Sequence, residues 1–236
     1  MERIAEASPR FKARIAGLFY FLTFLTAIPV VIVSSKIVVL GDAAATATNI
    51  LAHEPLFRLG FAAYVVNLAC YVVVTALFYR LFKPASRSLS LIAASFSIVA
   101  CSIQAVSTAF YLAPLVLLRD AQYLSAFKLE QTHALALMSI KLHTQTYNIG
   151  LVFFGFYCFF IGCLILRSTF LPRILGGLMA LGGLGWLTFI SAPLAKSLSP
   201  YNLGLGVLGE LSLTLWLLVM SVNTQRWKEQ AGYQKS

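Results

Sequence analysis

Charged side chains are scarce in this sequence, and acidic ones are the scarcest. Only 11% of the 236 residues are charged, eight residues are Asp or Glu, and 59% are hydrophobic. A soluble domain carries about 25% charged residues, so the polar side chains here are too few to cover one aqueous core. The composition excludes soluble nucleotide-binding folds, disulfide scaffolds and disordered chains. It predicts an integral membrane protein.

Cysteine and histidine are also rare, with four and three copies. All four thiols lie inside apolar runs, at Cys70, Cys101, Cys158 and Cys163. Disulfides need an oxidising aqueous face, and no CxxC pair or zinc-like Cys/His spacing is present. We therefore expect buried free thiols, no metal and no cofactor. A metal site at His143 and His133, with Asp120 and Glu130 nearby, is a minor alternative.

Recognisable catalytic motifs are missing as well. The sequence has no nucleophile elbow, HExxH, P-loop or Rossmann glycine pattern. Its glycine-rich stretch at 176–185 lies in an apolar run with no strand before it. Gly176, Ala180 and Gly183 share one helical face there, which predicts close helix packing. No catalytic residue is assigned, and an enzyme is not the favoured class.

Six apolar stretches are long enough to cross a bilayer, whose core of about 30 Å needs about 20 helical residues. They cover residues 15–33, 59–82, 89–112, 147–166, 174–194 and 203–222. The first is longer than the apolar region of a signal peptide, so we expect it to be retained. The third could continue past Pro114. We predict an all-α bundle of six transmembrane helices in a single domain, residues 1–236.

Basic residues are unevenly divided between the two ends of these spans. One side holds Arg3, Arg10, Lys12, Arg14, Arg80, Lys83, Arg87, Arg167, Arg173, Arg226, Lys228 and Lys235. The other holds Lys36, Arg58, Arg119, Lys128, Lys141 and Lys196. The positive-inside rule then places both termini in the cytoplasm. We attribute the net charge of +10 to residues that set the orientation in the membrane and contact anionic lipid, and not to nucleic-acid binding. Arg167 and Arg173 are predicted to lie at the level of the lipid headgroups.

The two long connections, residues 35–58 and 113–146, are predicted on the outer side. In the first, Asp42 is expected to cap an alanine-rich helix, and Pro55 to begin the next helix. The second has apolar residues near helical spacing between residues 125 and 143. This pattern predicts either a short amphipathic helix on the membrane surface or a direct extension of the fourth span.

Polar side chains within the spans indicate where a functional site would lie, because they are costly in hydrocarbon. Glu210 is the only carboxylate inside a predicted span, about 10 Å below the outer face at 1.5 Å per residue. The same outer layer contains Thr26, Asn67, Gln104, Asn148 and His143. These six residues predict a polar pocket open to the outside. The alternative is that the amides and Glu210 only join helices by hydrogen bonds.

Two sequence strings resemble the pattern of a bacterial family known as domain of unknown function 4386. They are RSTFLPRILG at residues 167–176 and GELSLTLWLL at residues 209–218. Weaker matches at 153–155, Gly162 and 14–17 extend the resemblance to about residues 10–225. The resemblance implies six spans and a bacterial inner membrane. It implies no activity.

Three function classes remain open at this point. The first is a small transporter or permeability protein, with Glu210 coupling a proton or binding a cation. The second is a non-catalytic structural or regulatory membrane factor that acts through helix packing. A lesser third is a membrane-embedded enzyme acting on lipid or quinone, with Glu210 and His143 as its acid/base pair. The partners we expect are the lipid bilayer and a small-molecule or ion substrate, and the oligomeric state is left open.

Overall fold

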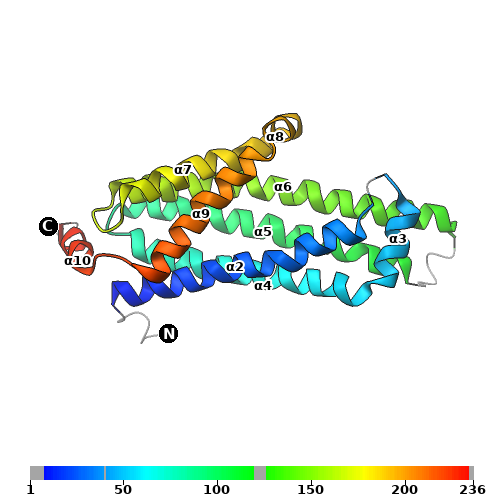
Figure 1. The fold of residues 1–236 in the computed structure, drawn as a ribbon, viewed down its shortest axis with the longest axis horizontal. Coiled ribbons are helices and arrows are strands. Elements are labelled where there is room, and N and C mark those ends of the chain that lie inside the picture. The colour runs from blue at the N-terminus through cyan, green and yellow to red at the C-terminus, as the bar shows by residue number, and fades with distance from the viewer. Residues whose placement is uncertain (1–7, 40, 120–125, 234–236) are drawn as a thin grey trace. The chain divides into compact units, whose positions relative to one another are not determined.

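The computed structural model describes residues 8–39, 41–119 and 126–233, and within them the chain is all-α. The helices are α2 (Pro9–Ile37), α3 (Ala43–Ala52), α4 (Glu54–Phe82), α5 (Arg87–Leu118), α6 (Leu129–Arg167), α7 (Arg173–Leu187), α8 (Ala192–Leu198), α9 (Tyr201–Val219) and α10 (Thr224–Tyr233) (Figure 1). A short 3-10 turn, Thr188–Ile190, follows α7. Arg3, Asp120 and Lys235, which entered the predictions above, lie outside the described residues. The predicted all-α class is confirmed.

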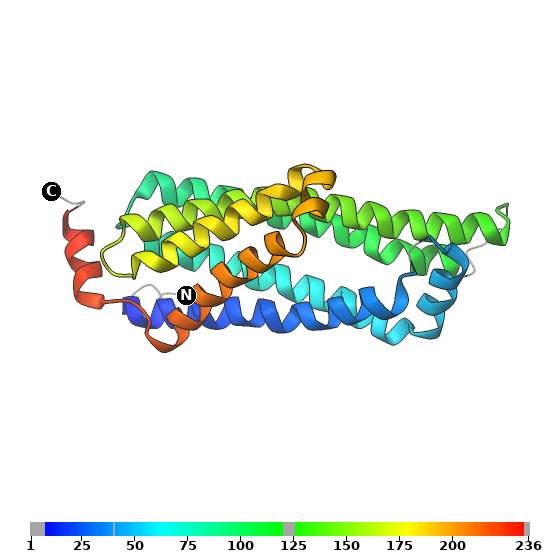
Figure 2. The same cartoon turned by 45° about the horizontal axis from the view of Figure 1, so that its top comes forward.

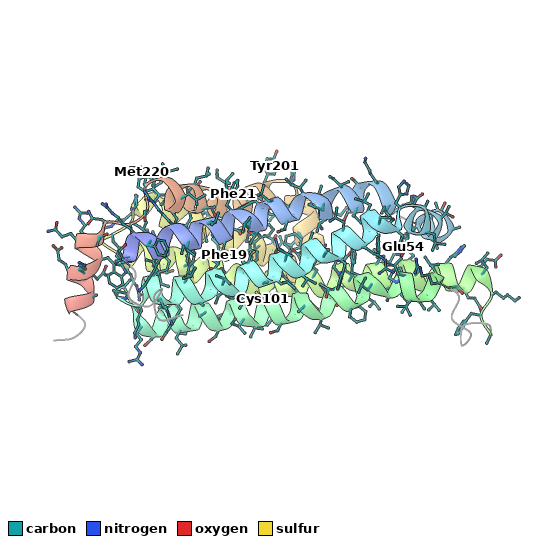
Figure 3. All side chains as sticks on the ribbon, turned by 90° about the horizontal axis from the view of Figure 1, so that it is seen from below. Phe19, Phe21, Glu54, Cys101, Tyr201 and Met220 are labelled. Carbon is teal, nitrogen blue, oxygen red and sulfur yellow. The ribbon has the colours of Figure 1, made fainter. Side chains whose placement is uncertain are left out.

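Six of these helices are long and apolar enough to cross a membrane. They are α2, α4, α5, α6, α7 with its 3-10 turn, and α9. Their large apolar side chains are widely exposed, as Figure 3 shows for Tyr201 and Met220 at either end of α9. Exposed apolar surface of this extent requires lipid around it, so the spans imply contact with the bilayer.

Two of the spans end before the predicted residue. The fifth helical segment ends at Ile190 and not at 194, because the backbone is extended at Ser191 and a separate helix, α8, begins at Ala192 with Pro193 in its first turn. The last span ends at Val219 and not at 222, because the chain turns at Ser221, whose φ is 62°. The third span does continue through Pro114 to Leu118.

Residues 129–146 of the connection before the fourth span belong to the same helix as that span. Helix α6 runs unbroken for 39 residues, so the direct extension is correct and the separate surface helix is not. The first long connection matches its prediction: the Asp42 carboxylate accepts a hydrogen bond from the Ala45 amide at 2.8 Å and caps α3. Pro55 lies in the first turn of α4 but is its second residue and not its first, because the helix begins at Glu54.

Replacing Asp42 with alanine should lower the free energy of unfolding by about 1 kcal/mol, because the Ala45 amide loses its acceptor. The buried thiols of Cys70, Cys101 and Cys158 provide the measurement, since a thiol-reactive dye labels them only on unfolding. Thr48→Ala on the exposed side of the same helix should leave the melting curve in place. Equal curves for wild type and Asp42→Ala would contradict the cap.

The chain divides into two compact units, and each is described by itself. The first is drawn from residues 1–22, 70–101 and 149–236, and the second from residues 23–69 and 102–148. Helices α2, α4, α5 and α6 each contribute to both units. Whether the chain forms one domain stays a prediction.

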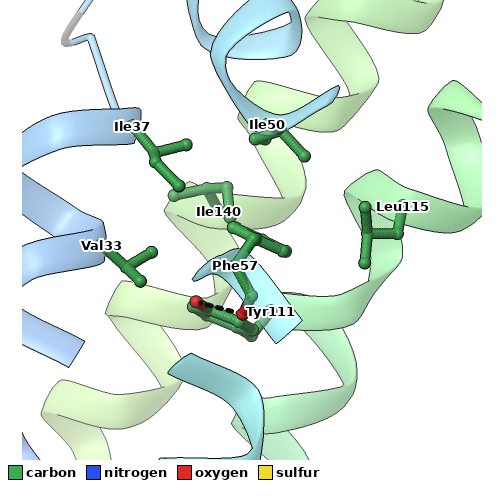
Figure 4. Close-up of a cluster of buried hydrophobic side chains, with 7 residues drawn as sticks. All are labelled: Val33, Ile37, Ile50, Phe57, Tyr111, Leu115 and Ile140. Atoms are coloured by element: carbon green, nitrogen blue, oxygen red, sulfur yellow. Dashed lines mark hydrogen bonds between the residues drawn. The ribbon is translucent and has the colours of Figure 1, made fainter. Parts of the chain in front are cut away.

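The second unit has its core where α3 lies across the ends of longer helices (Figures 1 and 4). Its buried residues are Val33, Ile37, Ile50, Phe57, Tyr111, Leu115 and Ile140. The Tyr111 ring stacks on Phe57 with centroids 4.4 Å apart, and its hydroxyl donates to the Phe57 carbonyl at 3.0 Å. The Asn49 amide donates to the Ile37 carbonyl and so ties α3 to the end of α2.

The first unit is built on helices that approach closely at glycine. A Cβ added to Gly162 of α6 would lie 2.6 Å from the Ala180 nitrogen and 2.7 Å from the Gly176 carbonyl oxygen of α7. A Cβ on Gly183 would lie 2.5 Å from the Phe159 nitrogen of α6. The predicted small-residue face of α7 is therefore confirmed as a packing face. Helix α9 lies beside α7 in both cartoon views (Figures 1 and 2).

Candidate functional site

Glu210 lies on α9 in the first unit, where only 4% of its surface is exposed. Its Oε2 atom accepts hydrogen bonds from the hydroxyls of Tyr20 at 3.0 Å and Tyr71 at 2.9 Å. Its Oε1 atom accepts one from the indole N–H of Trp186 at 2.8 Å. The donors come from α2, α4 and α7, so one carboxyl group joins four helices.

Small residues bring these donors within reach. A Cβ on Gly206 would clash with atoms of the Trp186 ring, so the glycine lets the indole lie against α9 one turn before Glu210. A Cβ on Gly17 of α2 would lie 3.1 Å from atoms of Leu217 and Leu218 of α9, and this tight approach holds Tyr20, one turn later on α2, near the same carboxyl group. Glycine therefore stands on α9 where α7 packs against it, and on α2 where α2 packs against α9.

Aromatic rings fix the orientation of the donors. Tyr20 and Tyr71 meet edge to face with centroids 5.8 Å apart, and Tyr71 meets Phe154 in the same way at 5.2 Å. Phe154 also contacts the Trp186 ring at 6.3 Å. Such edge-to-face pairs are favourable and restrict ring rotation. The hydroxyl and indole groups are therefore positioned before any ligand or proton arrives.

Three buried hydroxyl groups of the first unit have no hydrogen-bond partner among the described residues. Two lie within the spans, the phenol of Tyr157 on α6 and the Oγ1 of Thr214 on α9, and the third is the Oγ1 of Thr224 at the start of α10. Thr214 is one helical turn beyond Glu210, and the Tyr157 ring contacts Phe154, which packs against Tyr71 and Trp186. A buried polar group without a partner is costly and calls for a functional explanation.

The charge of Glu210 has no fixed counter-ion within the part of the chain that the structure describes. The ion pairs found there belong to Glu54, which contacts Arg58 at 2.7 Å and Arg119 at 2.5 Å. All three donors to Glu210 are neutral groups. A proton can neutralise a carboxyl group in this setting without breaking an ion pair, because no fixed positive charge is paired with it among the described residues.

The other five residues predicted for the polar pocket all lie in the second unit. The structure brings two of them together: the Asn67 amide donates to Thr26 Oγ1 at 2.9 Å and to the Thr23 carbonyl at 2.8 Å. Gln104 is buried and Asn148 is half-buried. The single pocket of six residues, and the pairing of Glu210 with His143 as acid and base, remain predictions.

His143 is buried at the wall of a cavity of about 470 Å³ in the second unit. One ring nitrogen, Nδ1, is 2.9 Å from the Ser107 carbonyl oxygen. Because a carbonyl only accepts, Nδ1 carries the proton and Nε2 accepts from the Tyr64 hydroxyl at 3.1 Å. The rings of Tyr64, Tyr111 and Tyr147 surround the imidazole with centroids 5.1 to 6.1 Å away.

Sequence reasoning found the acceptors of both sites and missed their donors. Tyr20, Tyr71 and Trp186 were not singled out for Glu210, nor was Tyr64 for His143. A signal was present, since tyrosine hydroxyls and indole N–H groups buried in apolar helices need partners. Which acceptor each one reaches depends on helix packing.

Arginines at the other end of the first unit line a second cavity of about 330 Å³. Its wall includes Arg10, Arg226 and the polar residues Ser221 and Asn223. Arg167, the last residue of α6, and Arg173, the first of α7, are exposed. Their contact with lipid headgroups stays a prediction. No group of three His, Cys, Asp or Glu is placed to hold a metal ion within residues 8–39, 41–119 and 126–233.

Comparisons with known proteins agree with the resemblance found in the sequence. The model of the family described as "Domain of unknown function (DUF4386)" matches residues 15–221. A protein of Archaeoglobus fulgidus described as uncharacterized is 28% identical over 156 residues, which cover 63% of this chain and 75% of the relative. No solved structure matches the chain.

Proposed function

We propose that this chain, which belongs to the DUF4386 family, is a proton-linked membrane transport protein. Glu210 takes up and releases the coupled proton. The observation that carries the proposal is a buried carboxyl group held by three neutral donors, with no fixed counter-ion in the described part of the chain. Intramembrane carboxylates of this kind are common in the proton relays of pumps and transporters.

The hydrogen bonds favour one oxygen as the proton's position. The Trp186 indole can only donate, so Oε1 must stay an acceptor. The hydroxyls of Tyr20 and Tyr71 can rotate and accept, so the proton binds at Oε2. The hydroxyls of Thr214 and Tyr157, which have no partner among the described residues, are further groups of the same unit that could pass a proton on.

The second candidate function is that of a non-catalytic structural membrane factor, and the hydrogen bonds of Glu210 to three other helices favour it. A carboxyl group that accepts from α2, α4 and α7 joins four helices, and such contacts stabilise membrane bundles by about 0.6 kcal/mol each. A purely structural Glu210 would keep one protonation state while the protein stays folded. The two candidates therefore differ in whether Glu210 titrates.

Infrared difference spectroscopy of the reconstituted protein tests this point. On stepping the pH, we expect the carboxyl C=O band of a buried protonated group to be replaced by carboxylate bands, and Glu210→Gln should lack this change. Glu54→Gln, which removes a half-buried glutamate that is paired with two arginines, should keep it. A wild-type spectrum in which no buried carboxyl titrates over the folded range would leave only the structural role.

The proposal also includes the orientation of the chain in the membrane. The excess of basic residues on the side of Arg14, Arg80 and Arg173 supports cytoplasmic termini and a location in the bacterial inner membrane. Glu210, the tenth of the 19 residues of α9, then lies near the middle of its span. A cysteine-labelling experiment with a membrane-impermeant reagent, on single-cysteine variants at the exposed positions Ser197 and Lys228, distinguishes the two orientations.

A further inference from the structure

We infer that the cavity beside His143 binds a neutral aromatic molecule bearing a hydroxyl group, a ligand of the phenol class. The cavity lies wholly in the second unit and holds about 470 Å³, within the range of small-molecule sites. The inference does not rest on proton transport, because it concerns a different group of residues.

The wall of this cavity presents acceptors. Tyr64 donates its proton to His143, and Tyr111 donates its proton to the Phe57 carbonyl. Thr144 and Ser35 donate theirs to the carbonyls of Ile140 and Ile32 in their own helices. Each hydroxyl keeps an oxygen lone pair after donating. A ligand that pairs with these four hydroxyls must therefore bring its own O–H or N–H donor.

The lining also selects against charge. It contains no Asp, Glu, Lys or Arg among the described residues, and His143 keeps Nε2 as an acceptor. An ionic ligand would enter a largely apolar space with no opposite charge to meet it. A neutral donor avoids this cost.

The remaining walls are rings and branched aliphatic side chains. Tyr64, Tyr111 and Tyr147 supply aromatic surface, and Val33 and Ile140 supply aliphatic surface. Flat aromatic molecules bury well between such groups and gain from edge-to-face contacts. The ligand that meets all three conditions is a neutral aromatic ring with a hydroxyl group, whose O–H donates to Tyr64 Oη beside His143.

Calorimetric titration of the detergent-solubilised protein with 1-naphthol tests the site. We expect saturable binding by wild type, and binding about tenfold weaker to 1-methoxynaphthalene, which has the same ring but no donor. The anion 1-naphthoate and the cation trimethylphenylammonium should bind more weakly than 1-naphthol. Equal binding of naphthol and its methyl ether, tighter binding of either ion, or no saturable binding would overturn the inference.

Two variants locate the binding. Tyr64→Phe removes the acceptor and should weaken naphthol binding about tenfold. Ser35→Phe fills the cavity from an exposed position and leaves the His143–Tyr64 pair intact, so it should abolish binding even if Tyr64→Phe proves unstable. Tyr201→Phe, exposed on α9 in the first unit, is the matched control. Binding by Ser35→Phe equal to wild type would place the ligand elsewhere and refute the site.

Discussion

Glu210→Gln is expected to reduce protein-dependent proton movement to the rate of protein-free vesicles. Glutamine keeps the size of the side chain and one acceptor oxygen, so Trp186 still has a partner at Oε1. Its NH₂ group cannot take the proton at Oε2, where Tyr20 and Tyr71 donate. The measurement is the fluorescence of a pH-sensitive dye inside proteoliposomes after a pH step, with each candidate solute added in turn.

Two further variants separate chemistry from packing. Glu210→Asp keeps a carboxyl group that can titrate, and it should retain part of the proton movement despite the shorter side chain. Trp186→Phe removes the donor to Oε1 but leaves Oε2 free to bind a proton, so its loss should be partial. If Glu210→Gln moved protons as fast as wild type, while melting at a lower temperature, Glu210 would be a helix connector only.

The spans could be predicted because the bilayer sets a length and a composition that the chain must meet. The errors fell where a local backbone event ended a helix inside an apolar run. Pro193 and the turn at Ser221 did this at the ends of the fifth and sixth spans. Hydropathy averaged over a window does not register a single proline or one residue with positive φ.

Glu210 could be predicted from the free-energy cost of burying a carboxyl group, but the residues that contact it could not. Glu210 stood out because a carboxyl group in hydrocarbon is expensive wherever it points. Its donors did not, because Tyr20 is 190 residues away along the chain and reaches it only through the approach of α2 to α9. By contrast, the packing face of Gly176, Ala180 and Gly183 was predictable, since the spacing within one helix defines it.

That face yields the largest expected change in stability. A Cβ on Gly183 would meet the Phe159 nitrogen at 2.5 Å and the Gly155 oxygen at 2.7 Å, both backbone atoms, so the helices themselves must separate. Gly183→Ala should therefore cost about 1–3 kcal/mol of unfolding free energy, measured by thiol labelling on heating. Gly177→Ala, on the same helix with open space around it, should be neutral or stabilising, because alanine is the better helix former.

The same variant connects packing to the carboxyl site. Gly183 precedes Trp186 by one turn of α7, so moving α7 away from α6 shifts the indole that donates to Glu210 Oε1. We expect Gly183→Ala to lower the melting temperature and to shift the infrared band of the Glu210 carboxyl group. Gly177→Ala should leave the band in place and should not lower the melting temperature. A lower melting temperature with an unchanged band would mean that the position of Trp186 is set by α9, through Gly206, and not by the contact of α7 with α6.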